Sequence, residues 1–192
     1  MLKLIGGIMK KNLFLLLISI IIISCGPEKE ELTSADYEKE KQEIIKVMEQ
    51  YTHAVENKNF SELIETLATE VIFFGTDSSE VIRTFPDFKM KMEEQWKTFD
   101  KMDYGDMYDI SIQMDDRATW ASIIYGSPLT ITLNGNSVKL FVRIARTLKK
   151  EKDRWVIVSG IVGNVLPEQA LELQKLLQSK GQTPTEPQQT NK

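Results

Sequence analysis

Apolar residues recur along this chain with two different periods, and these periods predict where helices and strands lie. A helix is expected to begin near Thr33 or Ser34, because Asp36 stands where it can complete an N-terminal cap. Its apolar stripe, at intervals of seven, four, three and four, consists of Tyr37, Ile44, Met48, Tyr51 and Val55. A short second helix is predicted over 60–69 and a third after Pro86, whose apolar face holds Phe88, Met92, Trp96 and Phe99.

Strands are predicted where β-branched and aromatic residues become frequent. The predicted strand segments are 71–74, a region that follows Tyr104, then 119–133, 138–148 and 155–165. Asn134-Gly135 is a strong hairpin signal, and the long strand before it is expected to be bent or bulged around Gly126 and Pro128. Helices come first and a meander of strands comes last, which predicts an α+β fold with helices on one face of a curved antiparallel sheet.

The start of the chain has the pattern of a secretory signal, which we expect over residues 1–24. Three lysines precede the apolar run Leu13–Ile23, and Ser24 stands before Cys25. The run is about half of the roughly 20 residues that cross a bilayer, so a permanent membrane helix is the weaker interpretation. Cys25 is the chain's one cysteine, so it has no internal disulfide partner and a modified thiol is favoured.

Residues 22–25 (Ile-Ile-Ser-Cys) resemble the lipobox of bacterial lipoproteins, although Ile23 departs from the usual small residue. The resemblance implies cleavage before Cys25, diacylglycerol and a further acyl group such as palmitate on that residue, and anchoring in the cell envelope. Several acyl chains on one residue anchor a protein stably. The residue after Cys25 is not Asp, which favours the outer membrane over the inner one. Residues 25–34 are then the lipidated cysteine and its tether.

Composition and charge limit the classes of partner and of site that the chain is expected to have. The chain has 192 residues and a net charge of −4, and the segment before Cys25 contains lysines but no acidic residue. The remainder is therefore more acidic still, which argues against nucleic acid as a partner. With one histidine and one cysteine and no carboxylates clustered at ligand spacing, neither a metal site nor a cofactor is expected. The histidine, His53, is expected to be exposed to solvent, nearly opposite the helix's apolar stripe.

Several short motifs together resemble the nuclear transport factor 2-like superfamily, in particular its SnoaL-like branch. The matching pieces are Tyr51-x-x-Ala54-Val55-x-Asn57-x-Asn59-Phe60, Phe74-Gly75-Thr76-Asp77, Ala118-x-Trp120, Arg143 and the run Asp153-Arg154-Trp155-Val156-Ile157-Val158. The resemblance implies a cone-shaped domain over 35–166. After it, an amphipathic pattern predicts a C-terminal helix over 167–180, and the Gln/Thr/Pro composition predicts a disordered tail over 181–192. It also implies a pocket between helices and sheet, and frequent dimers through the other sheet face. Members include isomerases, dehydratases, cyclases and binding proteins, so the fold alone fixes no function.

The resemblance suggests pocket residues, each with a simpler structural alternative. The candidates for binding are Tyr51, Asp77, Trp96, Trp120, Tyr125 and Arg143. Asp77 could act as a base at the pocket mouth, but an Asp before Ser-Ser more often satisfies loop amides. Arg143 could bind an anionic ligand, or it could pair with Asp77, Asp106 or Asp109 as part of the scaffold. The aromatic residues could equally be core.

Three hypotheses follow, and catalysis is not the favoured one. Where many SnoaL-like relatives carry histidines, the last strand of this chain reads Ser159-Gly160-Ile161-Val162-Gly163-Asn164. We therefore expect an envelope lipoprotein that binds a small apolar or amphipathic ligand, or a partner protein, and assign no catalytic residue. The alternatives are an isomerase, dehydratase or cyclase that uses Asp77 with Tyr51 or Arg143, and a dimeric assembly protein with a collapsed cone.

Overall fold

The computed structural model describes residues 32–75, 80–164 and 167–179, all within the compact unit 32–192. Its helices are α2 (Ser34–Glu56), α3 (Phe60–Glu65), α4 (Phe85–Thr98) and α5 (Pro167–Ser179). Its strands are β1 (Leu67–Phe74), β2 (Val81–Ile82), β3 (Lys101–Tyr104), β4 (Tyr108–Met114), β5 (Trp120–Leu133), β6 (Asn136–Glu151) and β7 (Arg154–Asn164). The predicted signal, Cys25, Asp77 and the predicted tail lie outside the described residues.

The helices begin where the capping residues predict. Thr33 caps α2, and its hydroxyl accepts from the backbone N–H of Asp36, whose carboxylate accepts from the Thr33 N–H in turn. Thr84 caps α4 in the same way, with Pro86 in the first turn. The expected stripe of α2 is buried from Ile44 to Val55. Both helices are therefore fixed by local sequence and by one apolar face each.

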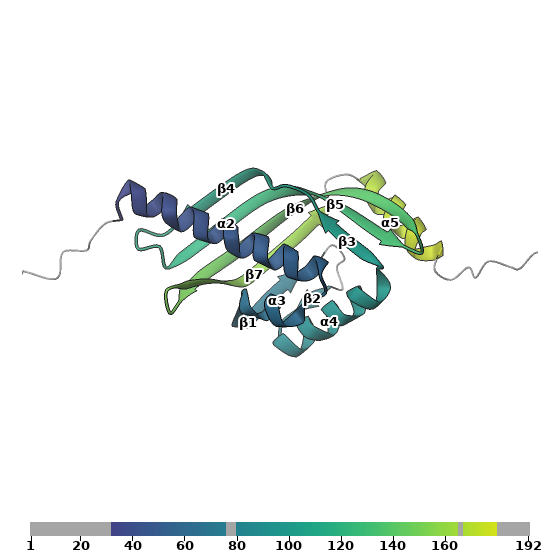
Figure 1. Cartoon of the computed structure of the whole chain (residues 1–192), viewed down its shortest axis with the longest axis horizontal. Coiled ribbons are helices and arrows are strands. Elements are labelled where there is room, and N and C mark those ends of the chain that lie inside the picture. Colours follow the sequence, from purple (N-terminus) through teal and green to yellow (C-terminus); the bar gives the residue numbers. More distant parts are fainter. Residues whose placement is uncertain (1–31, 76–79, 165–166, 180–192) are drawn as a thin grey trace, which may run out of the picture. The chain divides into compact units, whose positions relative to one another are not determined.

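The α+β fold is confirmed, with one departure from the predicted sheet. The strand order is β2-β1-β7-β6-β5-β3, and β4 pairs with β5 beside β3 (Figure 1). All pairs are antiparallel except β1 with β7, which is parallel, so the sheet is mixed. The parallel pair arises because β1 comes early in the chain and joins the sheet beside its last strand.

Type I′-like turns set the register of the long strands. Asn134 and Gly135 between β5 and β6 both have positive φ, 51° and 76°, and confirm the predicted hairpin. Lys152 and Asp153 between β6 and β7 adopt the same left-handed conformation, with φ of 50° and 64°. A one-residue slip would turn every inner side chain of these strands outward, so the turns fix which residues face the helices.

One local prediction was wrong and another was wrong in part. The second helix ends at Glu65 rather than at Thr69, because the backbone carbonyl of Thr66 accepts from the Ile157 N–H and draws the chain into the sheet. The expected bulge at Gly126 and Pro128 is not found in the β5–β6 ladder, which has no register shift there. The irregularity lies instead in β4, between Tyr108 and Ser111.

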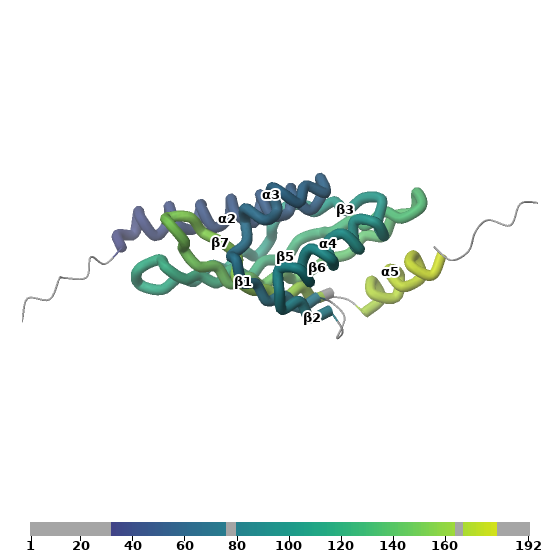
Figure 2. The backbone as a smooth tube through the Cα atoms, turned by 90° about the horizontal axis from the view of Figure 1, so that it is seen from below, coloured from purple at the N-terminus to yellow at the C-terminus, as the bar shows by residue number. Residues whose placement is uncertain are grey.

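The sheet has two faces of different character. Its inner face packs on α2 and α4 (Figure 2) and carries the hydrophobic core. Along each long strand, side chains point alternately to the inner and to the outer face. The inner side chains of β6 are Leu140, Val142, Ile144, Arg146 and Leu148. The outer ones of β6 include Lys139, Phe141, Arg143, Ala145 and Thr147. Arg146 is thus the charged residue in an otherwise apolar inner row.

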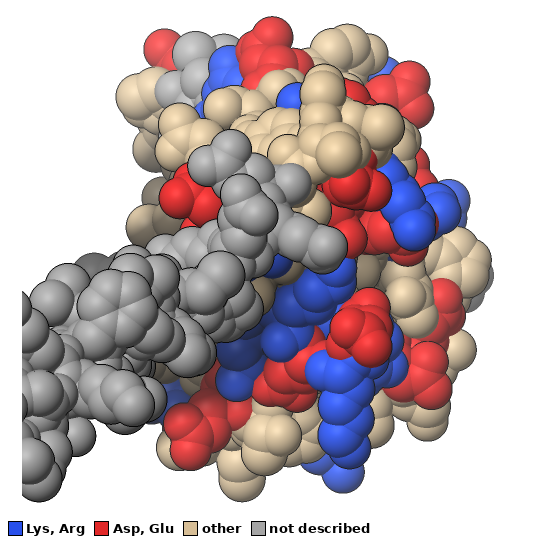
Figure 3. Space-filling view, turned by 90° about the vertical axis from the view of Figure 1, so that its left-hand side faces the viewer, with Lys and Arg blue, Asp and Glu red and all other residues tan. Residues whose placement is uncertain are grey.

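A polar cluster fastens the first half of α2 to the sheet. The Glu40 carboxylate accepts from Lys150 Nζ at 2.6 Å and from Trp155 Nε1 at 2.7 Å. At this end of the molecule basic and acidic side chains lie next to one another rather than in separate patches (Figure 3). Burial opposes ionisation of Glu40, but these two hydrogen bonds outweigh it and keep the pKa of that carboxyl below its ordinary value.

Candidate functional site

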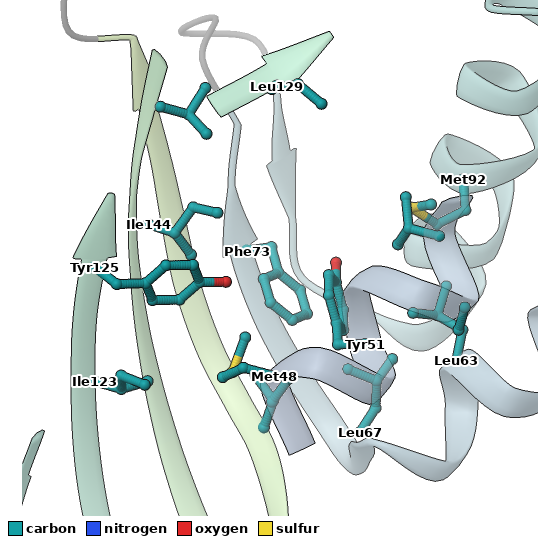
Figure 4. Packing of buried hydrophobic residues seen from close by; sticks show 14 of the residues in the cluster. Met48, Tyr51, Leu63, Leu67, Phe73, Met92, Ile123, Tyr125, Leu129 and Ile144 are labelled. Atoms are coloured by element: carbon teal, nitrogen blue, oxygen red, sulfur yellow. The ribbon is translucent and has the colours of Figure 1, made fainter. Parts of the chain in front are cut away.

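A cavity of about 120 Å³ lies between the inner face of the sheet, α2 and α4. Its walls come from α2, β1, β2, α4, β3, β5, β6 and β7, so it stands at the centre of the fold. Figure 4 shows Tyr125 reaching from its strand toward Phe73 and Tyr51, with Met92 at the α4 side. The lining is mostly apolar and aromatic, as is usual for small-molecule sites.

Arg146 brings a charge into this apolar cavity. Its side chain is almost fully buried, with 5% of its surface exposed. Nη1 donates to the backbone carbonyls of Ala145 and Ile161, each at 3.1 Å, and this holds one edge of the guanidinium. Nε is buried and has no hydrogen-bond partner. No carboxylate in the described part of the chain forms an ion pair with it.

A glycine leaves space for the Arg146 side chain, and two aromatic rings cover its guanidinium group. Gly160 lies opposite Arg146 on β7, and a Cβ atom there would collide with the Arg146 side chain. The guanidinium carbon lies 5.1 Å from the centre of the Phe73 ring and 5.5 Å from that of the Tyr51 ring. Ring faces offset part of the cost of burying a cation, but they leave its hydrogen-bond donors unused.

Tyr125 adds an unused hydroxyl to the same cavity. The residue is 1% exposed, and its hydroxyl has no hydrogen-bond partner. Burial raises the pKa of Tyr125 to about 12, against the opposing influence of Arg146. Burial likewise raises the pKa of Tyr104, which lines the cavity from β3, far above its ordinary value. At neutral pH both hydroxyls keep their protons, so Tyr125 is available as a donor rather than as a base.

The arrangement suits the recognition of an anion. Arg146 and Tyr125, each with one unused buried donor, line an apolar chamber, where a charge-assisted hydrogen bond is stronger than in water. None of the described lining residues is Asp, Glu or His, the side chains that most often transfer protons in enzymes. The described lining can therefore donate hydrogen bonds to an anionic group.

The predicted site residues fall into two groups. Tyr51 and Tyr125 line the cavity. Trp96 lies beside it in the core, where its Nε1 donates to the Val55 carbonyl at 3.0 Å and its ring packs against Phe60. Trp120 is half-exposed and belongs to the outer face.

Arg143 also lies on the outer face, where both of its terminal nitrogens donate to Asp109 at 3.1 Å. This is one of the scaffold pairings that the sequence left open. Asp77 lies outside the described residues, as does Cys25. His53 is exposed and contacts Glu62.

Other site classes receive no support from the described residues. No group of three or more His, Cys, Asp or Glu side chains within them could hold a metal ion. None of the helices in that part of the chain has both the length and the apolar content that a membrane crossing requires.

Sequence reasoning missed Arg146, Tyr104 and Gly160. A signal for the arginine was present, because side chains alternate between the two faces of a strand. Arg146 lies an even number of residues from the apolar positions Leu140, Val142, Ile144 and Leu148 and so shares their face, whereas Arg143 lies an odd number away. Counting alternation along the strand would have selected Arg146 as the inner residue. Gly160 carried no comparable signal, since its partner is set by the register between β6 and β7.

A sequence model of one family matches most of the domain. The model for the calcium/calmodulin dependent protein kinase II association domain matches residues 40–160. This span includes the cavity walls on α2, β1, α4 and β6. A search of curated proteins finds none that matches the chain.

Solved structures share the fold at low sequence identity. A candidate scytalone dehydratase from Novosphingobium aromaticivorans has a TM-score of 0.63 and 12% identity, covering 70% of this chain and 89% of that one. A candidate dehydratase of the nuclear transport factor 2-like family from Streptomyces avermitilis has a TM-score of 0.60 and 12% identity, covering 67% and 99%. A candidate calcium/calmodulin dependent protein kinase II association domain from Xanthomonas campestris has a TM-score of 0.58 and 17% identity, covering 66% and 87%. These likenesses confirm the superfamily fold expected from the sequence, and at such identities they carry no activity over.

Proposed function

Since the chain belongs to the calcium/calmodulin dependent protein kinase II association domain family, a nuclear transport factor 2-like family, we propose a binding role for its cone. The ligand is a small, mostly apolar molecule with one anionic group, which Arg146 and Tyr125 hold inside the cavity. The observation that carries this proposal is the buried guanidinium with an unused Nε and no carboxylate partner among the described residues. A buried, unpaired polar group costs about 1–3 kcal/mol, and more if it is charged, so an anion that satisfies it is strongly favoured.

The size of the cavity limits the ligand. Its volume of about 120 Å³ approaches that of an engineered cavity of roughly 150 Å³ that holds benzene. A short aliphatic acid is therefore of suitable size for the chamber around Arg146.

Binding without turnover is the better-supported role. The described cavity offers Arg146 and three tyrosines, Tyr51, Tyr104 and Tyr125, as its titratable groups. Two of these tyrosines have raised pKa values, and an arginine does not lose its proton in proteins. Proton transfer near neutral pH needs a group that titrates there, which Tyr104 and Tyr125 do not provide.

The test uses matched pairs of acids and amides with residues 26–192, which contain the whole described fold. Acetate, butyrate and benzoate are titrated by calorimetry beside acetamide, butyramide and benzamide. We expect at least one acid to bind at millimolar concentration or below, to raise the melting temperature, and to bind at least tenfold more tightly than its amide. Absence of binding by all three acids, or equal binding of acids and amides, would count against the proposal.

We propose in addition that this domain is tethered to the cell envelope, preferably to the outer membrane, through lipid on Cys25. The support is the sequence alone, namely the basic and apolar pattern of residues 1–24 and the lipobox-like residues 22–25. Mass spectrometry of the expressed full chain should find an acylated N-terminal peptide that begins at Cys25. Cys25→Ser should abolish both the acylation and the cleavage before residue 25, and an unmodified Cys25 would refute the tether.

A second candidate role is pairing of two copies through the outer face of the sheet. One row of paired positions crosses four strands there and is apolar throughout: Phe74, Ile161, Ala145 and Ile124. Ile161 and Ile124 are each 51% exposed, which is unusual for residues at the middle of a sheet. The family name, which describes an association domain, agrees with this role.

Sedimentation of residues 26–192 tests the pairing. We expect a dimer for the unchanged protein and a monomer for Ile124→Lys, because a charge in the middle of the row is costly to bury. Thr130→Lys is the matched control, since Thr130 lies on the same face of β5 but outside the row. If Ile124→Lys and Thr130→Lys sediment like the unchanged protein, the row is not the contact.

A further inference from the structure

The cavity around Arg146 adjoins a groove on the surface. Gly75, Ile82, Met92 and Gln95 line both, so these residues form the neck between the two spaces. The groove has a volume of about 460 Å³, several times that of the inner chamber. A molecule held by its anionic end at Arg146 would therefore have a defined way out along α4.

The groove has an apolar floor and a charged rim. Ile82, Met92, Phe99 and Leu177 supply its apolar side chains, and Leu177 comes from α5. Lys91 and Glu94 stand at its edge, where they pair with one another at 3.0 Å and are largely exposed. Leu177 is 39% exposed, and a large apolar side chain beside a groove that leads to a buried cation suits a hydrocarbon chain.

The two walls of the groove are held by specific contacts. Lys58 Nζ donates to the backbone carbonyls of Trp96 and Phe99, at 2.9 and 3.0 Å, and so fixes the end of α4. On the opposite side, α5 is held on the sheet by buried Leu176 and by Gln169, whose side-chain oxygen accepts from the Phe141 N–H at 2.9 Å. The groove is therefore a built feature of the fold, lined mainly by α4 and by residues at β1 and β2, with Leu177 from α5.

We propose that the ligand is an elongated monocarboxylic acid, with its carboxylate at Arg146 and its alkyl chain in the groove against Leu177. The inference rests on the proposed function and extends it by naming the ligand class and a second subsite. Short acids fill the inner chamber alone, whereas an acid of about eight carbons passes the neck and contacts the groove. Each added methylene that is partly buried should tighten binding about two- to fourfold.

The test compares butyrate with octanoate by calorimetry, below the micelle concentration of octanoate, on residues 26–192. We expect octanoate to bind at least tenfold more tightly than butyrate. Leu177→Ser should remove most of this gain while leaving butyrate affinity unchanged. Leu171→Ser is the matched control, because Leu171 lies on the same helix and is more exposed, at 57%, but does not line the groove.

A measurement without substitution guards against a variant that loses its fold. With 13C-labelled leucine methyl groups, octanoate should shift the Leu177 signals and leave those of Leu171 in place, and butyrate should shift neither.

The outcomes separate the two proposals. Equal affinity for both acids, or an octanoate gain that Leu177→Ser and Leu171→Ser reduce alike, overturns the chain subsite and leaves anion binding intact. Failure of both acids to bind overturns the anion site together with this inference.

Discussion

Two arginines on strand β6 show how differently the same side chain is used on the two faces of one sheet. Arg143 points to the outer face, is about half-exposed, and pairs with Asp109. Arg146, three residues later, points to the inner face, is buried, and pairs with no carboxylate among the described residues. Each lies opposite a glycine of β7, Gly163 and Gly160 respectively.

The comparison separates a scaffold contact from a binding group. An exposed ion pair contributes little to stability, because water screens it and two side chains must be ordered. A buried charge without a counterion is costly to the free protein and is retained where something else gains from it. The outer arginine therefore needs no ligand to explain it, while the inner one does.

The largest expected effect comes from replacing the two arginines with methionine. Arg146→Met should weaken binding of the best small acid by about 3 kcal/mol, roughly a hundredfold, because the charge-assisted contact is lost. The free protein should become more stable, by about 1 kcal/mol or more, since a buried charge with no ion-pair partner among the described residues is removed. Arg143→Met should change neither quantity appreciably.

Calorimetry with the acid and urea unfolding of the free proteins measure both effects. A loss of more than about 2 kcal/mol in the stability of Arg146→Met would show that its two carbonyl contacts suffice and that the residue is scaffold.

The second-largest effect on stability is expected from substituting the glycines that lie opposite the two arginines. Gly160→Ala should lower the free energy of unfolding by about 1–3 kcal/mol and weaken acid binding, because the new Cβ atom displaces the Arg146 side chain and lies 2.8 Å from the Ala145 carbonyl oxygen. Gly163→Ala should be neutral, since nothing lies within 4 Å of a Cβ atom at that position. The comparison is made by urea unfolding of both variants, and equal losses would show that the crowding at Gly160 is relieved elsewhere.

Glu40 provides a partly buried contact of intermediate size whose effect depends on pH. Its pKa is below the ordinary value of a glutamate in the folded protein, so ionised Glu40 stabilises the fold above that value, and the stability is lost as the pH falls through the folded pKa. Glu40→Gln should cost about 1–2 kcal/mol at pH 7, because the ionic contact with Lys150 is lost. Urea unfolding between pH 7 and pH 3 should show the gap between the two proteins closing, and a constant gap would contradict the assignment.

Much of the fold followed from the sequence because its signals are local. The cap at Thr33, the buried stripe of α2 and the Asn134-Gly135 turn each depend on residues close in the chain. The end of α3 did not follow, because the Thr66 carbonyl pairs with Ile157, ninety-one residues away. Long-range pairing of this kind overrides helix propensity and leaves no local trace.

The site was harder to predict for a related reason. Tyr51 and Tyr125 were selected as aromatic residues, yet Trp96 and Trp120 had similar local patterns and lie outside the cavity lining. Arg143 attracted attention through its apolar neighbours, although strand parity points Arg146 inward. The site depends on which face each strand presents, so it could be derived only after register and turns had been fixed.

The smallest effect is expected at the outer ion pair, and it completes the contrast with Arg146. Asp109 has a φ of 52°, in the left-handed region that Asn and Asp tolerate better than other side chains. Asp109→Asn therefore keeps the backbone conformation and a hydrogen-bond acceptor, and removes only the charge opposite Arg143. We expect a change in unfolding free energy of less than about 0.5 kcal/mol, with acid binding unaltered. The same unfolding and calorimetric measurements apply, in low salt, where any surface attraction is greatest. A loss above about 1 kcal/mol would mean that the outer arginine is as important to the fold as the inner one is to the ligand, and the distinction between the two faces would fail.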